Sequence, residues 1–443
     1  MNGRAWAANQ LAARLLAGPW TRASILECIR AAYGAVHHPT RAALAVRVAA
    51  LGAAGYPPSP QTLVAHLYAS EFFRPLPASL VPSALDPPRF APAPAFDGLP
   101  IPALATPGEL AAWLALPPEQ LDWLSDERRV HRRATQPVFQ HYRYTVITKA
   151  RGGTRLLEAP KPRLKAIQRR ILHEILDAAP LHPRAHGFAP GRSCLTGAQV
   201  HAGEAVVLTL DLQGFFPSIG LPRVHGLFRR LGYPWAVARR LAGLCTTTTP
   251  ASILLRHPGP ADPHDGRDLY RLPHLPQGAP TSPALANLAA WTLDLRLHGL
   301  ARALDANYTR YADDLAFSGD LRSATQLDRF QKTAAAIVQD EGFRLNPEKT
   351  RVMPRSTQQR VTGIVVNAHC NPDRAAFDAL KALLHNCTRT GPAAQNREGL
   401  PDFHRNLQGR VAWVEHLNPA RGAKLRRLFD GIRWEGAVPP MAA

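Results

Sequence analysis

The sequence predicts an α+β fold in which a small antiparallel sheet is accompanied by many helices. Apolar stretches rich in β-branched and aromatic residues, at 205–211 and 307–319, indicate strands. Apolar residues with helical spacing dominate the chain before residue 73 and after residue 371. Separate runs of helices and strands, without regular alternation between the two, are typical of the α+β class.

The net charge of the chain predicts a polyanionic partner. Lys and Arg number 53 and Asp and Glu number 33, so the formal charge at pH 7 is +20. Residues 126–170 carry 13 basic and 3 acidic side chains, so the charge is concentrated there. At 443 residues, 46% of them hydrophobic, the chain is also long enough for more than one domain.

Cysteine usage and hydropathy exclude several classes of protein. The five cysteines are scattered and form no Cys-x-x-Cys pair, so neither a zinc site nor a disulfide framework is expected. The chain lacks an apolar run of about 18 residues and a charged-then-apolar leader. These features predict a cytoplasmic protein without a membrane partner.

Residues 1–73 are predicted to form an N-terminal helical accessory region. Apolar residues recur there with helical spacing at Leu11, Leu15, Ile25 and Ile29. Prolines interrupt the pattern before a further short helix at 61–73. The region carries no chemical motif, so a protein-binding or RNA-binding role and a plain structural appendage both remain open.

Residues 74–108 are predicted to be a linker. They contain ten of the 42 prolines and little regular pattern, which favours an extended, semi-stiff chain. A disordered tether and an extended strap lying on the rest of the protein are both compatible with this composition.

A basic β-hairpin is expected near the start of the next region. Residues 142–147 and 155–158 alternate in the manner of strands and are joined through Gly152 and Gly153. A helix with one basic face is expected at 164–176.

Three acids provide the strongest chemical signal. Asp211 ends an apolar strand, and Asp313 and Asp314 lie between two apolar strands, where they fit a tight hairpin turn. Adjacent like charges in an apolar setting are costly unless a cation is present, and carboxylate oxygens suit Mg²⁺. Acids from separate segments can hold two metal ions roughly 3.5–4 Å apart for phosphoryl transfer. The alternative is an ordinary Asp-Asp turn exposed to water.

These residues resemble the motifs of a known family, the reverse transcriptases. The four matching blocks, in the family's order, are Asp211 with Phe215 and Phe216, Leu275 to Pro283, Tyr311 to Asp314, and Gly342 to Thr350. The third block is similar to the family's Tyr-x-Asp-Asp box. The resemblance covers roughly residues 109–435.

The resemblance implies an RNA-directed DNA polymerase shaped like a right hand. Fingers and a palm with an antiparallel sheet would occupy residues 109–370, and a helical thumb residues 371–443. Two Mg²⁺ ions, or Mn²⁺ in their place, would be held by Asp211 and Asp313. Asp314 would be the third acid, and the backbone carbonyl of Leu212 a further ligand.

The resemblance also implies roles around the deoxynucleoside triphosphate. Arg155 and Lys161 would reach it from the fingers, although a solvated basic face is the alternative for each. Gln277 and Gly278 would line the nucleotide and template pocket. Two further residues have more specific roles: Phe216 would block a ribose 2′-OH, unless it is a core aromatic, and Lys349 would lie near the pyrophosphate as a proton donor.

Three segments resemble retron reverse transcriptases in particular. Residues 197–201 are similar to the retron Asn-Ala-x-x-His box and contain its histidine, His201, although Gly197 replaces the asparagine. Residues 361–363 match a retron Val-Thr-Gly triplet, which suggests a hairpin at the primer end. Arg192, in a Gly-Phe-x-x-Gly-Arg-Ser element, is a candidate template contact.

A retron enzyme would copy a structured non-coding RNA into a short multicopy single-stranded DNA joined to that RNA. The resemblance implies a role in antiphage defence with a separate effector protein. His201 and Arg192 are expected to contact nucleic acid. In the thumb, the residues with the same expected role are Arg410, Lys424, Arg426 and Arg427. The alternatives are another bacterial reverse transcriptase, from a group II intron or a different defence system, and an inactive nucleic-acid-binding scaffold.

Overall fold

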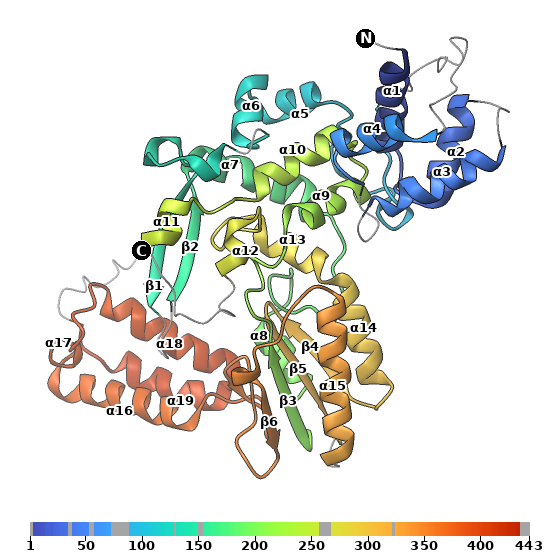
Figure 1. The fold of residues 1–443 in the computed structure, drawn as a ribbon. Coiled ribbons are helices and arrows are strands. Elements are labelled where there is room, and N and C mark those ends of the chain that lie inside the picture. The colour runs from blue at the N-terminus through green and yellow to red at the C-terminus, as the bar shows by residue number, and fades with distance from the viewer. Residues whose placement is uncertain are drawn as a thin grey trace. The chain divides into compact units, whose positions relative to one another are not determined.

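The computed structural model divides the chain into two compact units (Figure 1). The first comprises residues 1–181 and 214–291, and the second residues 182–213 and 292–443. The residues that the structure describes are 3–33, 38–52, 57–71, 88–127, 130–148, 154–256, 267–320 and 324–434.

The first unit begins with a helical region that has its own core. Its helices are α1 (Gly3–Ala17), α2 (Arg22–Tyr33), α3 (His38–Ala50) and α4 (Pro60–Ala69). The four apolar positions expected to lie inside, Leu11, Leu15, Ile25 and Ile29, are all buried. Helix α4 ends earlier than the sequence predicts, because the backbone N–H and the hydroxyl of Ser70 both donate to the carbonyl of Leu67.

The described part of the proline-rich segment, from residue 88 onward, is a strap and not a tether. Its backbone pairs with the end of a helix: Ala91 N donates to Gly232 O and Ala93 N to Arg230 O, both at 2.9 Å. Gly232 has a φ of 110°, and a Cβ there would lie 2.7 Å from the backbone nitrogen of Pro92. Glycine therefore permits the close approach. The part at 74–87 lies outside the described residues.

The remainder of the first unit combines helices with one two-stranded sheet. Strands β1 (Tyr142–Thr148) and β2 (Thr154–Pro160) pair antiparallel, which confirms the expected hairpin; its connection at 149–153 lies outside the described residues. The surrounding helices are η2 (Pro94–Phe96), α5 (Pro107–Leu114), α6 (Pro118–Leu124), η3 (His131–Arg133), η4 (Pro137–Phe139), α7 (Pro162–Ile171), the π-helical η5 (Leu172–Leu176), α9 (Leu221–Arg230), α10 (Trp235–Cys245), α11 (Ala251–Arg256), α12 (Arg267–Arg271) and α13 (Ser282–Ala289).

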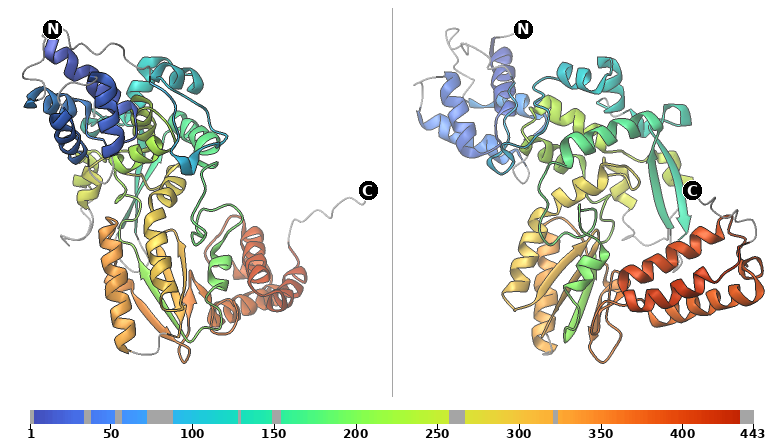
Figure 2. Two further views of the ribbon diagram at one scale, coloured as in Figure 1. Left: turned by 90° about the vertical axis from the view of Figure 1, so that its right-hand side faces the viewer. Right: turned by 180° about the vertical axis from the view of Figure 1, so that it is seen from behind.

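The second unit is built on a four-stranded antiparallel sheet in the order β4-β5-β3-β6. Its strands are β3 (Val206–Asp211), β4 (Asn307–Tyr311), β5 (Asp314–Gly319) and β6 (Arg351–Pro354). Helices α14 (Trp291–Arg302) and α15 (Ala324–Asp340) cover one face (Figure 2). Tyr308 and Phe317 lie opposite each other on that face, where Tyr308 bonds to Asp294 of α14 and Phe317 packs against Phe330 of α15.

The other face of this sheet is covered by α8 (Cys194–Gln199). Short elements and then a group of helices follow the last strands of the sheet along the chain. Turn η6 (Pro347–Lys349) precedes β6, and the hairpin of β7 (Arg360–Val361) and β8 (Ile364–Val365) joins the core beneath α8. Thr362 and Gly363 form its two-residue turn with left-handed φ angles of 48° and 83°, as such turns require.

The last helices form a separate core in the second unit. They are α16 (Arg374–Thr390), α17 (Pro392–Gln395), α18 (Phe403–Leu417) and α19 (Pro419–Asp430). Gly422 lets α18 and α19 approach closely, because a Cβ there would lie 2.3 Å from the Cα of Glu415. Helices and strands are thus mixed as the sequence predicts. No helix among the described residues is long and apolar enough to cross a membrane.

Candidate active site

The paired acids form a tight turn at one end of the four-stranded sheet. Strand β4 ends at Tyr311 and β5 begins at Asp314, and these two residues are paired. Ala312 and Asp313 are therefore the two loop residues. Ala312 has a left-handed φ of 55°, a conformation that two-residue hairpin turns use. This acidic turn, residues 311–314, confirms the predicted hairpin.

The third acid lies beside the acidic turn. Asp211, the last residue of β3, is paired with Asp314 in the register of β3 and β5. The next backbone N–H, that of Leu212, donates to the carbonyl of Asp313 at 2.9 Å. Asp211 is buried, whereas Asp314 reaches solvent. Strand pairing therefore brings Asp211 beside two acids that lie about a hundred positions later in the chain.

One cation, Lys349, pairs with these acids, and the pKa of one acid is raised. Lys349 Nζ donates to Asp211 Oδ1 at 2.7 Å. Loss of water around the Asp314 carboxyl, and then the charges of Asp313 and Asp211, raise its pKa to about 6, against a smaller lowering by Lys349. An additional positive charge near these carboxylates would lower that pKa again.

The acids fit a divalent ion in their chemistry, but they are not yet arranged around one. Among the described residues, no group of three or more His, Cys, Asp or Glu side chains is placed to hold a metal ion. Asp211 is instead paired with Lys349. Carboxylate oxygens are the ligands that Mg²⁺ prefers. Burial first, and then repulsion by Asp313 and Asp211, raises the pKa of Asp314.

The first unit positions the residues expected to contact nucleotide. Glu158 of β2 donates its backbone N–H to the carbonyl of Gln277 at 2.9 Å. Gly278 has a φ of 127°, and a Cβ there would lie 3.3 Å from the carbonyl oxygen of Glu158. The Glu158 side chain is fully buried and accepts hydrogen bonds from Thr249 Oγ1 at 2.7 Å and His274 Nε2 at 2.8 Å. The basic hairpin and the Gln277–Gly278 turn are thus held together.

Known proteins match both the motifs and most of the chain. Residues 147–366 match the family described as reverse transcriptase (RNA-dependent DNA polymerase). The retron Mx65 reverse transcriptase of Myxococcus xanthus is 45% identical over 292 residues, which are 65% of this chain and 64% of that protein. The retron Mx162 reverse transcriptase of the same organism is 38% identical over 350 residues, 75% of this chain and 68% of that protein. The chain belongs to the retron-type reverse transcriptases.

A third relative comes from a different bacterium. The retron Ec86 reverse transcriptase of Escherichia coli is 32% identical over 250 residues, which are 55% of this chain and 70% of that protein. The family is one of RNA-directed DNA polymerases, and this chain spans 64% of the Mx65 protein and 68% of the Mx162 protein. The resemblance seen in the four motif blocks is therefore confirmed.

His201 does not have the role expected of it in this retron-type enzyme. It is fully buried, with Nδ1 at 2.7 Å from Ser318 Oγ and Nε2 at 2.7 Å from Thr309 Oγ1. Burial lowers its pKa to about 3, so the ring is neutral. The expectation that His201 contacts nucleic acid is wrong for this structure, because both ring nitrogens join β4 to β5.

Arg192 is bound to the protein backbone. Its Nη1 donates to the carbonyls of His182 at 2.9 Å, Pro183 at 2.8 Å and Ala185 at 2.8 Å. These bonds shape the segment that runs beside β4, where His186 N donates to Arg310 O at 2.7 Å. Arg192 thus supports a neighbour of the acidic turn. Its contact with a template stays a prediction.

The candidate residues of the first unit differ in how accessible they are. Lys161 Nζ donates to the carbonyls of Pro137 at 2.6 Å and Val138 at 3.2 Å, so its ammonium group is already bound to η4. Arg155 is exposed on β2. Phe215 is buried and Phe216 is half-buried, which leaves Phe216 the more accessible of the two aromatic rings.

The basic residues of the C-terminal helices also fall into two groups. Arg426 donates from Nε and Nη2 to the two carboxylate oxygens of Glu415, at 2.9 and 2.6 Å. It therefore joins α19 to α18. Arg410, Lys424 and Arg427 are exposed. These three residues have the accessibility that a contact with phosphate groups requires.

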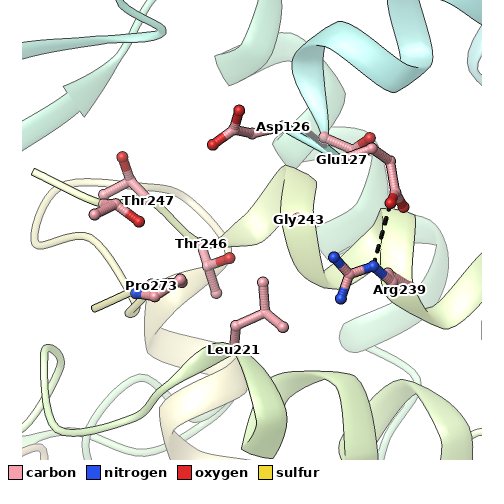
Figure 3. A pocket seen from close by; sticks show the side chains of 10 residues that line it. Asp126, Glu127, Leu221, Arg239, Gly243, Thr246, Thr247 and Pro273 are labelled. Atoms are coloured by element: carbon pink, nitrogen blue, oxygen red, sulfur yellow. Dashed lines mark hydrogen bonds and ion pairs between the residues drawn. The ribbon is translucent and has the colours of Figure 1, made fainter. Parts of the chain in front are cut away.

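A small cavity in the first unit is too small to compete as the active site (Figure 3). It lies beside α10, where Arg239 Nε donates to Glu127 Oε2 at 3.2 Å. Its volume is about 30 Å³. Ligand pockets of roughly 300 Å³ and more hold small molecules, whereas this space suits a water molecule or two.

Sequence reasoning gave no role to four buried charged residues: Glu158, His274, Asp294 and Arg310. Each is at most 1% exposed. Two of them could have been noticed in the sequence, because Glu158 and Arg310 are charged residues inside stretches whose pattern predicts strands. Their partners lie elsewhere in the chain and give no local signal.

Proposed function

We propose that this enzyme is the polymerase of a retron, which copies a structured non-coding RNA into a short multicopy single-stranded DNA joined to that RNA. The observation that carries the proposal is the pairing of Asp211 with Asp314 next to Asp313. Identities of 45% and 38% to two enzymes named as retron reverse transcriptases support it. The right-hand division, with fingers and palm at 109–370 and a thumb at 371–443, is part of the proposal.

The acids would carry out two-metal nucleotidyl transfer. Asp211, Asp313 and Asp314 would hold two Mg²⁺ ions, or Mn²⁺, with the carbonyl of Leu212 as a further ligand. Such ions, when bound, lower the pKa of the primer hydroxyl and neutralise charge on the pyrophosphate. Strand pairing keeps these three acids at one end of the sheet, and binding of the ions would require Asp211 to exchange its contact with Lys349 for a metal ion.

The remaining site residues would bind the substrate and select it. Lys349, released from Asp211, would hold a proton near the pyrophosphate. Gln277 and Gly278 would line the nucleotide pocket, with Arg155 and Lys161 near the triphosphate. Phe216, the half-buried aromatic, would exclude a ribose 2′-OH.

The charge of the chain suits the proposed nucleic-acid partners. A formal charge of +20 and the exposed Arg410, Lys424 and Arg427 favour contacts with phosphate groups, together with Arg192 and Arg426 if they reorient. Such binding weakens steeply as salt is added. The proposed biological setting is antiphage defence with a separate effector protein.

The test is to isolate the protein from its native host, with its flanking locus intact, and to sequence the nucleic acid that accompanies it. The control is the double variant Asp313→Asn, Asp314→Asn. The expected result is one discrete short DNA joined to RNA, absent from the control. DNA of mixed sequence without an RNA branch would instead indicate another bacterial reverse transcriptase, and no DNA would favour a scaffold.

A further inference from the structure

Arg310 is a fully buried cation inside the sheet that carries the acidic turn. It lies on β4, and its side chain is inaccessible to solvent. The guanidinium donates from Nε to Asp294 Oδ1 and from Nη2 to Asp294 Oδ2, both at 2.7 Å. Tyr308 donates its hydroxyl to Asp294 Oδ1 at 2.8 Å. A bidentate pair of this kind is directional as well as strong.

One donor of the guanidinium bonds to the acidic turn itself. Nη1 of Arg310 donates to the carbonyl of Ala312 at 3.1 Å. Ala312 is the residue directly before Asp313, and its φ of 55° is one that residues with a Cβ seldom adopt. Such a conformation persists only where the surroundings impose it.

The segment at residues 184–187 holds the acidic turn from a second side. Arg310 N donates to Arg184 O at 2.8 Å and Arg310 O accepts from His186 N at 2.7 Å. A Cβ on Gly187 would lie 2.5 Å from the backbone nitrogen of Ala312, so glycine lets this segment lie directly against the turn. The side chain of Arg310 thus bonds to the carbonyl of Ala312, and Gly187 lies against the backbone nitrogen of the same residue.

We propose that Asp294 and Arg310 form a clamp that positions Asp313 and Asp314 for divalent-ion binding. A buried ion pair adds little stability compared with apolar residues of the same volume, so stability alone does not account for it. The clamp supplies what apolar residues lack, a rigid donor for the carbonyl of Ala312. Asp294 and Arg310 are positioning residues, and the inference rests on the proposed two-metal function.

The chain offers two matched controls. Tyr308→Phe removes the hydroxyl bonded to Asp294 and leaves the Arg310–Ala312 contact in place. Arg296→Lys changes an arginine on the same helix as Asp294, whose partners are Asp340 and Glu341. Arg310→Lys keeps the charge, but an ammonium group cannot bond to both Asp294 oxygens and Ala312 in the geometry of a guanidinium.

The experiment measures Mn²⁺ binding to the full-length protein without nucleic acid, by titration calorimetry and by the electron paramagnetic resonance signal of free Mn²⁺. Arg310→Lys should weaken Mn²⁺ binding about tenfold, as loss of a residue that orients metal ligands does. It should raise the Mg²⁺ concentration for half-maximal synthesis by a similar factor, with the KM for deoxynucleotides unchanged. Tyr308→Phe and Arg296→Lys should bind Mn²⁺ as the unaltered protein does.

If the folded Arg310→Lys variant binds Mn²⁺ as tightly as the unaltered protein does, the clamp proposal is overturned. It is also overturned if the unaltered protein binds no Mn²⁺. If Arg310→Lys does not fold, Asp294→Asn keeps the shape of the partner and should show the same loss. Unchanged affinity in Asp294→Asn then overturns the inference. Wild-type protein that binds Mn²⁺ but makes no DNA contradicts the proposed function and leaves the test of the clamp intact.

Discussion

Two buried acid–base pairs, one in each unit, each support a turn that we propose takes part in the reaction. In the first unit, Glu158 and His274 lie beneath the Gln277–Gly278 turn, at 2.8 Å between Oε2 and Nε2. In the second, Asp294 and Arg310 lie beneath the acidic turn. Both pairs are fully buried or nearly so, and both join segments that are separate in the chain.

The pairs differ in whether their cation titrates. An arginine stays charged at all ordinary pH values, so the Asp294–Arg310 pair does not change. Burial disfavours the charged form of His274, but the ionised Glu158 and the carbonyl of Leu272, which accept from its two ring nitrogens, raise its pKa above the usual 6.5. We infer that the acidic turn is held independently of pH and the Gln277–Gly278 turn is not.

The largest effect on stability is expected from Arg310→Met. It leaves Asp294 buried without its cation, a change that costs about 3–5 kcal/mol of unfolding free energy. Arg296→Met removes a half-exposed arginine from the same helix as Asp294 and should cost less than about 1 kcal/mol. Denaturant unfolding of both variants measures the difference. Similar losses for the two would show that the buried pair is not special.

A smaller effect is expected from Glu158→Gln. The amide keeps the shape but removes the carboxylate charge that pairs with protonated His274, and loss of this charged hydrogen bond costs about 1–3 kcal/mol. Loosening of the Gln277–Gly278 turn should also raise the KM for deoxynucleotides severalfold, with little change in kcat. Thermal unfolding and steady-state synthesis measure these two quantities. A fall in kcat with constant KM would place Glu158 in a different role.

The difference between the pairs should be visible as a pH dependence. The pKa of His274 is higher in the folded than in the unfolded chain, so its stabilising contribution is complete below pH 6.5 and is lost as pH rises through the raised value. The unfolding free-energy difference between wild type and Glu158→Gln should therefore shrink as pH rises above 6.5 and through the raised pKa of His274. The corresponding difference for the double variant Asp294→Asn, Arg310→Met, which removes both charges, should stay level because the arginine does not titrate. The comparison would be contradicted if the difference for the Asp294–Arg310 pair changed with pH and the difference for Glu158→Gln did not.

The smallest effect on stability is expected at the half-exposed ion pair beside the acids. Lys349 is 53% exposed but its partner Asp211 is only 8% exposed, so Lys349→Met should cost about 1 kcal/mol, more than an exposed pair and less than the fully buried Arg310. Synthesis should nevertheless fall if Lys349 supplies a proton to the pyrophosphate. Single-turnover rates measured beside the unfolding curve separate the two effects. Equal synthesis by the variant removes Lys349 from the chemistry.

The parts of the site that depend on local sequence could be predicted. Two apolar strands around Asp313 and Asp314 indicated a hairpin turn, and an apolar run ending in Asp211 indicated a strand that ends at that residue. Alternation and Gly-Gly indicated the hairpin of β1 and β2. The two hairpins join residues close in the chain, and the strand that ends at Asp211 is marked by its own apolar residues, although its partners lie more than a hundred residues later.

The supporting contacts could not be predicted, because they join distant segments. Glu158 and His274 are 116 positions apart, and the sequence contains no distance between them. His201 was expected to contact nucleic acid from its place in a motif, yet packing buries it between Thr309 and Ser318. The proline-rich composition allowed both a tether and a strap, and the bond from Ala91 to Gly232 decides for the strap.

The central claim is that Asp211, Asp313 and Asp314 catalyse DNA synthesis on an RNA template. Incorporation of labelled deoxynucleotides on a primed RNA, by wild type, Asp313→Asn and the surface control Asp328→Asn, tests it most directly. Wild type and Asp328→Asn should extend the primer, and Asp313→Asn should be slower by at least about 10²-fold, since bound metal ions contribute several kcal/mol. Extension by Asp313→Asn at the wild-type rate would contradict the account.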